Sequence, residues 1–163
     1  MTEVTIYTDG ACSGNGQGNA RGGWAAIVKL DCSDAHRELS GGERGTTNQR
    51  MEIRAVIEGL KALKGPCAVK VYSDSSYLIN CMNEHWYRRW RSNGWISSQR
   101  KPVVNRELWE ELLAVVAVVE GSGHAVTWEK VDGHANQKRN HVSTEHEIFN
   151  QRCDELAVAA VPA

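Results

Sequence analysis

The sequence predicts an α/β domain built around a mixed β-sheet. Three observations support this fold class: strand-like runs come first as a meander, later strands alternate with helical segments, and two separate strands run directly into an aspartate. A meander pairs strands antiparallel, whereas strand–helix–strand connections pair them in parallel, so both pairings are expected in one sheet. With 163 residues the chain is long enough to bury a core, and we expect one domain spanning residues 1–163.

The first half of the chain is predicted to contain three strands and one helix. The strands are expected at residues 3–9, 22–30 and 35–42. The helix is expected within residues 46–65, where apolar residues recur at helical spacing. Thr47 or Asn48 can cap its start, and Gly65 followed by Pro66 is a stop signal.

The second half is predicted to alternate strands with helices. The expected elements are a strand at 67–74, a helix at 75–90, a helix capped by Asn105, a strand at 124–131 and a closing helix around 154–161. The helix after Asn105 carries a single apolar stripe, which is typical of a helix that packs on a core. Trp95 and Trp109 are expected in that core.

Composition and charge restrict the class of protein. The chain is 41% hydrophobic and 24% charged, as is usual for a globular protein, and no stretch reaches the roughly 20 apolar residues of a membrane span. The N-terminus lacks the pattern of a signal peptide, and the five cysteines are odd in number without a CxxC pair, so we expect a cytoplasmic protein with reduced thiols and no membrane contact. A net charge of −1 does not by itself predict a polyanionic partner.

Four acidic residues are the candidate catalytic and metal-binding groups. Asp9 and Asp74 each end a strand, and if these strands are parallel neighbours the two carboxylates meet at the carboxyl edge of the sheet. Glu52 lies early in the first helix and Asp154 near the start of the closing helix. Converging carboxylates repel one another, and a divalent cation with oxygen ligands, Mg²⁺ or Mn²⁺, relieves that repulsion. Two such ions about 4 Å apart can activate a water and stabilise the leaving oxygen of a phosphodiester.

Each acid also has an ordinary structural interpretation. A single acid at the end of a strand is usually a turn or cap residue, which applies to Asp9. An acid in the first turn of a helix is favoured by the helix dipole, which applies to Glu52 and Asp154. The four acids carry chemistry only if the fold brings them together, and their spacing in the chain does not establish that.

Six motifs occur in order along the chain. They are YTDGACSGN, TTNQRMEIRAVIEGL, VYSDSSYLIN, GWISSQRKPVVNRELWEEL, VDGHAN and NQRCDELA. Together they resemble ribonuclease H type 1, the bacterial ribonuclease HI family, over essentially the whole chain. The resemblance implies the ribonuclease H-like fold, a five-stranded mixed sheet flanked by helices. It also implies that two Mg²⁺ ions, with Mn²⁺ as a substitute, support cleavage of the RNA strand of an RNA–DNA hybrid to 5′-phosphate and 3′-hydroxyl ends.

The same resemblance assigns site residues. The family's catalytic, metal-binding acids fall on Asp9, Glu52, Asp74 and Asp154, and its mobile-loop histidine falls on His134. Its RNA-strand contacts fall on backbone groups around Gly10 and Cys12 and on the side chains of Asn15, Asn48 and Gln49. Amides suit a ribose 2′-hydroxyl because they both donate and accept hydrogen bonds. Small residues after Asp9 are expected to let the substrate backbone approach closely, although Asn15 can also be a turn residue and Asn48 a helix cap.

Residues 85–101 supply local positive charge. They include no acid, and their cations are Arg88, Arg89, Arg91, Arg100 and Lys101. The segment resembles the basic protrusion of bacterial members, which implies phosphate contacts to the DNA strand, with Trp86 as an additional contact. The ordinary interpretation is a solvated basic face with Trp86 and Trp90 as a core pair.

The chain departs from the family pattern between GHAN and CDELA. Residues 137–152 form a longer stretch than usual, and its polar composition predicts a surface excursion outside the core. His141, Glu145 and His146 could form a transition-metal site, although His-x₄-His spacing is a weak signal on its own. A neighbouring histidine could also replace His134.

The sequence therefore predicts a monomeric ribonuclease HI that binds an RNA–DNA hybrid. One alternative is a DNA-cutting member of the same fold superfamily, such as an integrase or a resolvase, but the acids of those enzymes do not occur in RME, SDS and CDELA motifs. The other alternative is a catalytically silent hybrid-binding module, which gains nothing from four clustered acids.

Overall fold

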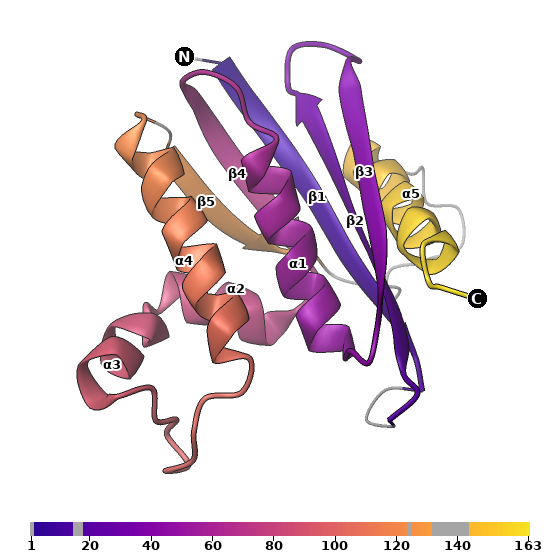
Figure 1. Ribbon diagram of the computed structural model, residues 1–163. Helices are drawn as coiled ribbons and strands as arrows, with labels where there is room; N and C mark the ends of the chain where they lie inside the picture. Colours follow the sequence, from indigo (N-terminus) through magenta and orange to yellow (C-terminus); the bar gives the residue numbers. More distant parts are fainter. Residues whose placement is uncertain (1, 15–17, 124, 132–143) are drawn as a thin grey trace.

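A computed structural model describes residues 2–14, 18–123, 125–131 and 144–163, which form a five-stranded sheet covered by helices on both faces (Figure 1). The strands are β1 (Thr2–Ser13), β2 (Arg21–Leu30), β3 (His36–Arg44), β4 (Cys67–Ser73) and β5 (Ala125–Lys130). The helices are α1 (Asn48–Lys61), α2 (Ser76–Asn83), α3 (Trp86–Asn93), α4 (Arg106–Gly121) and α5 (Glu145–Ala159). None of the helices described is long and apolar enough to cross a membrane.

The sheet has the strand order β3-β2-β1-β4-β5 and is mixed, as predicted. The meander pairs β1 with β2 and β2 with β3 antiparallel. The helical crossovers then pair β1 with β4 and β4 with β5 in parallel. The physical reason is the length of the connections, since a short turn reverses the chain whereas a helix returns it to the same end of the sheet.

Helices cover the two faces of the sheet unequally. Figure 1 shows α1, α2 and α4 on one face and α5 on the other. Because side chains alternate along β1, Ile6 belongs to the large core beneath α1 while Tyr7 belongs to a smaller cluster beneath α5. That smaller cluster consists of Tyr7, Ala25, Ile27, Cys153 and Ala157.

Helix α1 forms where the sequence predicts it and ends earlier than expected. Thr47 is the N-cap, and its Oγ1 accepts a hydrogen bond from the backbone N–H of Arg50 at 3.2 Å. The helix ends at Lys61, before the predicted stop at Gly65, which has a left-handed φ of 72°. Residues 62–64 are not helical and connect the end of α1 to Gly65.

The prediction of a single helix over residues 75–90 is wrong, because the chain turns between the end of α2 at Asn83 and the start of α3 at Trp86. His85 has a φ of 56°, a conformation that no residue within a right-handed helix adopts. The turn lets Trp90 bury itself against Trp109, with ring centroids 5.5 Å apart. Trp95 and Trp109 are buried in this region, as predicted. Tertiary packing of the tryptophans thus overrides a continuous helical pattern.

Helix α5 begins at Glu145, well before the predicted start near residue 154. Thr144 caps it by accepting from the backbone N–H of Glu147 at 3.3 Å. Phe149 stacks on Tyr7 with ring centroids 5.3 Å apart. The prediction of a surface excursion outside the core is therefore wrong at Phe149, and residues 145–152 form helix with exposed or half-buried side chains. Residues 137–143 of that prediction lie outside the described part of the chain.

Candidate active site

Asp9 lies on β1, and Asp74 lies at the same level directly after the end of the neighbouring strand β4. The parallel ladder between β1 and β4 runs as far as the pair Tyr7↔Tyr72, and each aspartate comes two residues later. The expected parallel pairing is confirmed, but β1 does not end at Asp9. It continues beside β2 as far as Ser13, so Asp9 lies within a strand whose other neighbour, β4, has already ended.

Helix α1 brings Glu52 to the same place by close packing at Gly10. A Cβ atom on Gly10 would lie 2.8 Å from the backbone nitrogen of Glu52 and 3.0 Å from Met51, so only glycine lets the start of α1 approach the strand this closely. Gly10 is thus required for the packing of α1, and the expectation that small residues after Asp9 leave room for substrate stays a prediction.

Helix α5 brings Asp154 in from the opposite face of the sheet. The fully buried Cys153 packs its Sγ 3.5 Å from the carbonyl oxygen of Tyr7 and 3.3 Å from that of Ala25. Gly23 allows this approach, since a Cβ atom there would lie 2.1 Å from the carbonyl oxygen of Ala157. Asp154 follows Cys153 directly, and its carboxyl group lies near enough to Asp9 to help raise the pKa of that residue.

Burial and the neighbouring carboxylates change the protonation of two of the acids, Asp9 and Glu52. Burial, followed by the charge of Asp74 and the contact with Asp154, raises the pKa of Asp9 to about 8, although the N–H of Gly10 donates to its Oδ1 at 2.8 Å. Burial, followed again by the charge of Asp74, raises the pKa of Glu52 to about 7. The fold therefore links the four carboxylates in one electrostatic series, from Asp154 through Asp9 and Asp74 to Glu52.

This donor set fits a divalent cation in charge and chemistry. Carboxylate oxygens are the ligands that Mg²⁺ and Mn²⁺ prefer, and a cation offsets both the burial of these charges and their mutual repulsion. Within the described ranges, no three His, Cys, Asp or Glu side chains already form a group that could hold a metal ion. Mutual repulsion opposes such a group until a cation neutralises it.

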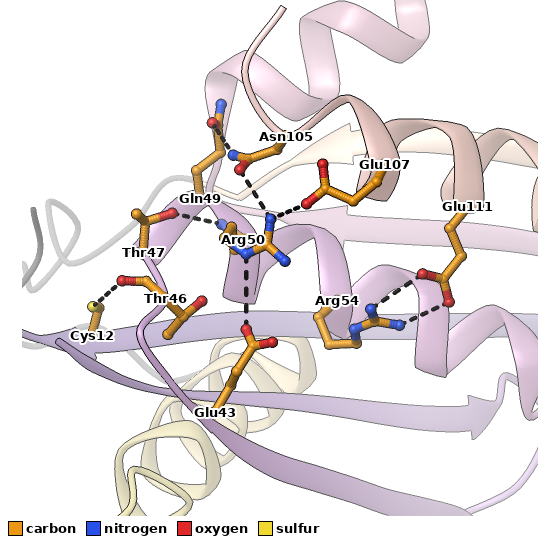
Figure 2. Close-up of polar contacts among 10 residues, drawn as sticks. All are labelled: Cys12, Glu43, Thr46, Thr47, Gln49, Arg50, Arg54, Asn105, Glu107 and Glu111. Atoms are coloured by element: carbon orange, nitrogen blue, oxygen red, sulfur yellow. Dashed lines mark hydrogen bonds and ion pairs between the residues drawn. The ribbon is translucent and has the colours of Figure 1, made fainter. Parts of the chain in front are cut away.

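The predicted RNA-strand contacts lie around the start of α1. Asn48 does not cap the helix; its Nδ2 donates to Glu52 Oε1 at 2.9 Å. Gln49 is half-buried, and its Oε1 accepts from Asn105 Nδ2 at 2.9 Å (Figure 2). Cys12 is also half-buried, with its Sγ 3.9 Å from the carbonyl oxygen of Thr46. Asn15 and His134 lie outside the described residues.

Asn105 is a residue of this region whose role the sequence interpretation missed. It was predicted to cap α4, and it does occupy the N-cap position, but its side chain makes no capping hydrogen bond. Instead it contacts Gln49 and Arg50, which are far away in the chain. No local sequence signal identifies such a contact, because only the packing of α4 beside α1 creates it.

The basic segment forms α3 and the residues after it, which extend away from the sheet (Figure 1). Arg88, Arg89 and Arg91 are exposed, and the Arg91 guanidinium lies 5.6 Å from the centre of the Tyr87 ring. Trp86 is half-buried, and its ring meets Tyr77 edge-on with centroids 5.3 Å apart. Trp86 therefore packs against the core while part of its ring stays accessible. The three arginine side chains are exposed to solvent.

Of the trio proposed for a transition-metal site, the structure describes Glu145 and His146. His146 has its Nδ1 2.6 Å from the hydroxyl oxygen of Tyr7, and Glu145 forms an ion pair with Lys29 at 2.7 Å. His141 lies outside the described residues. Both described members of the trio thus serve to dock α5 on the sheet.

Comparisons with known proteins agree with this geometry. The RNase H family model matches residues 1–162. Ribonuclease H of Moorella thermoacetica is 50% identical over 163 residues, a match that covers 100% of this chain and 94% of the relative.

Two solved structures extend the comparison to the fold. LC9-RNase H1, a type 1 RNase H with the type 2 active-site motif, superposes with a TM-score of 0.76 at 30% identity, covering 98% of this chain and 72% of that one. LC11-RNase H1 in complex with an RNA/DNA hybrid superposes with a TM-score of 0.61 at 18% identity over 98% of this chain and 96% of that one, which is a likeness of fold alone. With a family model matched over nearly its whole length and a relative half identical to it, the chain belongs to the ribonuclease H family and is a nuclease of that family.

Proposed function

We propose that the chain hydrolyses the RNA strand of RNA–DNA hybrids endonucleolytically and leaves 5′-phosphate and 3′-hydroxyl ends. The observation that carries this proposal is the electrostatic series of Asp154, Asp9, Asp74 and Glu52, which come from α5, β1, the loop after β4 and α1. Asp9, Glu52 and Asp154 are half-buried and Asp74 is exposed, and carboxylates that repel one another in this way are costly unless they bind a cation, which supports a functional rather than a structural role for the cluster. The names of the relatives support the same conclusion.

The four acids are the proposed ligands of two Mg²⁺ ions, for which Mn²⁺ can substitute. When bound, such ions supply an activated water and stabilise the leaving oxygen of the phosphodiester. Asp9 interacts with both Asp74 and Asp154, so it is the candidate ligand common to both ions. Asn48 donates to Glu52 and thereby orients that carboxylate. His134 is proposed to assist proton transfer or product departure.

Recognition of the hybrid is proposed to use two separate surfaces. The RNA strand contacts the backbone near Gly10 and Cys12 together with Asn15, Asn48 and Gln49, since amides can bond a 2′-hydroxyl in either direction. The DNA strand contacts the exposed arginines of α3, Arg88, Arg89 and Arg91, with Trp86 beside them. Membership of the ribonuclease H family supports this substrate class.

The remaining proposals concern the state of the protein in the cell. We infer a monomer that acts in the cytoplasm. The support is the sequence, which carries an odd number of cysteines, and the five cysteines are free thiols in the structure.

A cleavage assay with three substrates tests the proposal. A labelled RNA–DNA hybrid is incubated with and without Mg²⁺, beside double-stranded RNA and double-stranded DNA, and the product ends are mapped. We expect metal-dependent cuts in the RNA strand of the hybrid only, and 5′-phosphate ends. Cleavage of double-stranded DNA would support the DNA-cutting alternative, and tight hybrid binding without cleavage would support the silent binding module.

A pair of variants separates the metal-binding acids from the loop histidine. Asp9→Asn keeps the size of the side chain and removes its charge, so cleavage should fall by several orders of magnitude. His134→Ala removes only assistance to proton transfer or release, a contribution of about 10²–10⁴-fold at most, so measurable cleavage should remain. An Asp9→Asn variant as active as His134→Ala contradicts the metal-binding assignment of Asp9.

A further inference from the structure

A cavity of about 600 Å³ lies beside β5, between that strand and the helices α2, α3 and α4. Figure 1 shows α4 over β5, with α3 near the end at which α4 begins. The floor of the cavity is apolar and consists of the buried side chains of Met82, Leu113, Val116 and Trp128. The four site acids, all of them described, lie outside its lining. The cavity can therefore take an apolar side chain at a place separate from the candidate active site.

The cavity reaches the outer edge of β5. Its lining includes the four consecutive residues Val126, Thr127, Trp128 and Glu129. Successive side chains of a strand point to opposite faces, so a cavity over one face alone would be lined by every second residue. Trp128 belongs to the core, and the side chains of Thr127 and Glu129 therefore point to the other face. Lining by both sets means that the cavity extends around the edge of the strand, alongside its backbone.

The backbone of this edge presents groups for a further strand. The N–H of Val131, just after β5, donates to β4 at 2.9 Å, so alternate residues before it also face β4. Val126 and Trp128 are then the residues whose backbone groups face outward. In agreement, the Nδ2 of Asn83 donates to the carbonyl oxygen of Trp128 at 3.2 Å from outside the sheet. Among the described strands β5 comes last in the order of the sheet, and such an edge can pair with an additional strand.

Charged side chains of opposite sign mark the two ends of the cavity. Glu120 lies in the last turn of α4, close to the start of β5, because only residues 122–124 connect the two elements. His85 and Arg91 lie at the other end, because the bond from Asn83 sets the α2–α3 turn beside the second half of β5. The side chains of Glu120, His85 and Arg91 are exposed. A segment that runs antiparallel to β5 therefore meets the two basic side chains first and the carboxylate last.

The length of the cavity fits a short extended segment. The cavity follows α4 from Leu113 to Glu120, two turns of helix or about 10 Å along the axis. An extended chain advances about 3.3 Å per residue, so roughly three residues span that length. A five-residue segment then reaches the charged side chains at both ends.

We propose that the edge of β5 binds an extended segment of a partner protein as an additional strand, antiparallel to β5. One apolar side chain of the segment fills the cavity, an acidic residue before it meets His85 and Arg91, and a basic residue after it meets Glu120. A strand fits this surface better than a nucleic acid does, because only a strand matches backbone groups that recur at every second residue. The inference goes beyond the proposed function and does not depend on the acid cluster.

A synthetic peptide serves as the probe. It has blocked ends and the sequence aspartate, threonine, isoleucine, threonine, lysine, so that the charged residues and the isoleucine share the face turned to the cavity. Threonine favours the extended conformation at the two positions between them. Titration into the ¹⁵N-labelled chain should shift the backbone amides of Val126 and Trp128 most. A control peptide in which aspartate and lysine are exchanged should bind at least about fivefold more weakly, because both charged contacts become repulsive.

Two variants of α4 test the cavity. Ala117→Arg places a long side chain in the cavity from its exposed rim, and Ala114→Arg adds the same side chain to the same helix outside the lining. Alanine and arginine are both good helix formers, so circular dichroism should show both variants folded. We expect Ala117→Arg to weaken binding of the probe at least about tenfold and Ala114→Arg to change it less than about twofold.

Two proline variants test the edge of the strand. Val126→Pro removes an N–H that faces outward, so it should weaken binding at least about fivefold, the size of one hydrogen bond, and leave the pairing with β4 intact. Thr127→Pro removes an N–H that faces β4, so it should lower the melting temperature more than Val126→Pro does. Equal stability of the two variants would contradict the outward direction of the Val126 N–H and overturn the proposal.

The remaining outcomes also decide the matter. The proposal is overturned if the probe does not bind, if the exchanged peptide binds equally well, or if Ala117→Arg or Val126→Pro binds like the wild type. It is also overturned if single-stranded oligothymidylate displaces the probe and shifts the same amides, which would make the cavity a nucleic-acid site. Sedimentation that shows self-association through these amides would make it an interface between two copies of the chain. Binding as expected by a chain that fails to cleave the hybrid would support this inference while the proposed function fails.

Discussion

Burial and the neighbouring acids make the ionised form of Asp9 unfavourable in the folded protein. It is flanked by Asp74 and Asp154, and burial together with their proximity favours its protonated form. The backbone N–H of Gly10 offsets only part of this, through one hydrogen bond at 2.8 Å. A residue that destabilises the metal-free fold in this way is expected where function requires the charge.

Replacing Asp9 by asparagine should separate stability from activity. We expect Asp9→Asn to lose cleavage by several orders of magnitude and to raise the metal-free melting temperature by roughly 2–4 °C, the shift that corresponds to about 1 kcal/mol in a chain of this size. The gain arises because the neutral amide no longer meets the charge of Asp74. Thermal unfolding in EDTA at pH 8 measures it.

The control for this prediction is an acid outside the cluster. Asp34 is exposed in the turn between β2 and β3, and Asp34→Asn should change neither stability nor cleavage appreciably. A destabilised Asp9→Asn protein would mean that the hydrogen bond from Gly10 outweighs the repulsion between carboxylates.

At the scale of elements, α5 depends on its first turns to reach the sheet. Its start is fixed by contacts with side chains of β1 and β2: the Phe149 ring stacks on Tyr7, His146 bonds the Tyr7 hydroxyl, and Lys29 pairs with Glu145. The second half of the same helix carries Cys153 and Asp154. The anchoring of the first half therefore helps to hold a site acid in position.

The anchoring can be tested with two adjacent residues. Phe149→Ala removes a half-buried ring from the cluster with Tyr7, and we expect it to cost about 2 kcal/mol of unfolding free energy. Ile148→Ala removes a side chain that is 57% exposed and should change stability by less than about 0.5 kcal/mol. Urea denaturation compares the two. Equal small effects would show that the first half of α5 is not docked in solution.

Helix α3 is expected to contribute affinity for the substrate without taking part in the chemistry. Replacing Arg88, Arg89 and Arg91 by alanine removes three exposed cations and leaves the buried Trp90 in place. We expect KM for the hybrid to rise by about tenfold, and its logarithmic dependence on salt to lose about three units of slope, while kcat changes by a small factor. Steady-state kinetics at several salt concentrations measure these quantities.

This prediction fails if kcat collapses at saturating hybrid while the circular dichroism spectrum is unchanged. The arginines would then belong to the active site. A useful comparison is Arg44→Ala, which removes an exposed cation from the edge strand β3, outside α3. This substitution should leave KM nearly unchanged.

At the scale of the whole molecule, the acid cluster links stability to pH and to metal. The pKa values of Asp9 and Glu52 are raised to about 8 and about 7, from 3.8 and 4.5. Between about pH 4 and pH 8 the folded protein therefore binds more protons at these groups than the unfolded chain does. The contribution of the cluster to stability is greatest at low pH and is lost as the pH rises through these values.

A titration of melting temperature tests this linkage. In EDTA, we expect the cluster to make the protein less stable at pH 8 than at pH 6, and Asp9→Asn should reduce that slope. Mg²⁺ binds the ionised carboxylates of the folded state, so it should raise the melting temperature more at pH 8 than at pH 6. Equal effects of Mg²⁺ at both pH values, or in Asp9→Asn, would indicate binding elsewhere on the protein.

The sequence by itself determined the elements whose pattern is local. Alternation and turn residues identified the strands of the sheet, the order of strands and helices identified its mixed pairing, and helical spacing with a threonine cap identified α1. The motifs further identified the four acids as candidates. Such patterns are readable because each depends on residues within one or two turns of one another.

The tertiary structure decided the features that depend on distant contacts. The break at His85 follows from the burial of Trp90 against Trp109, and the early start of α5 follows from the docking of Phe149 on Tyr7. The contact of Asn105 with Gln49 joins residues 56 positions apart. Local propensity at Asn105 favours a helix cap, and only the packing of α4 on α1 gives its amide a better partner, because a hydrogen bond between distant residues exists only after the fold has brought them together.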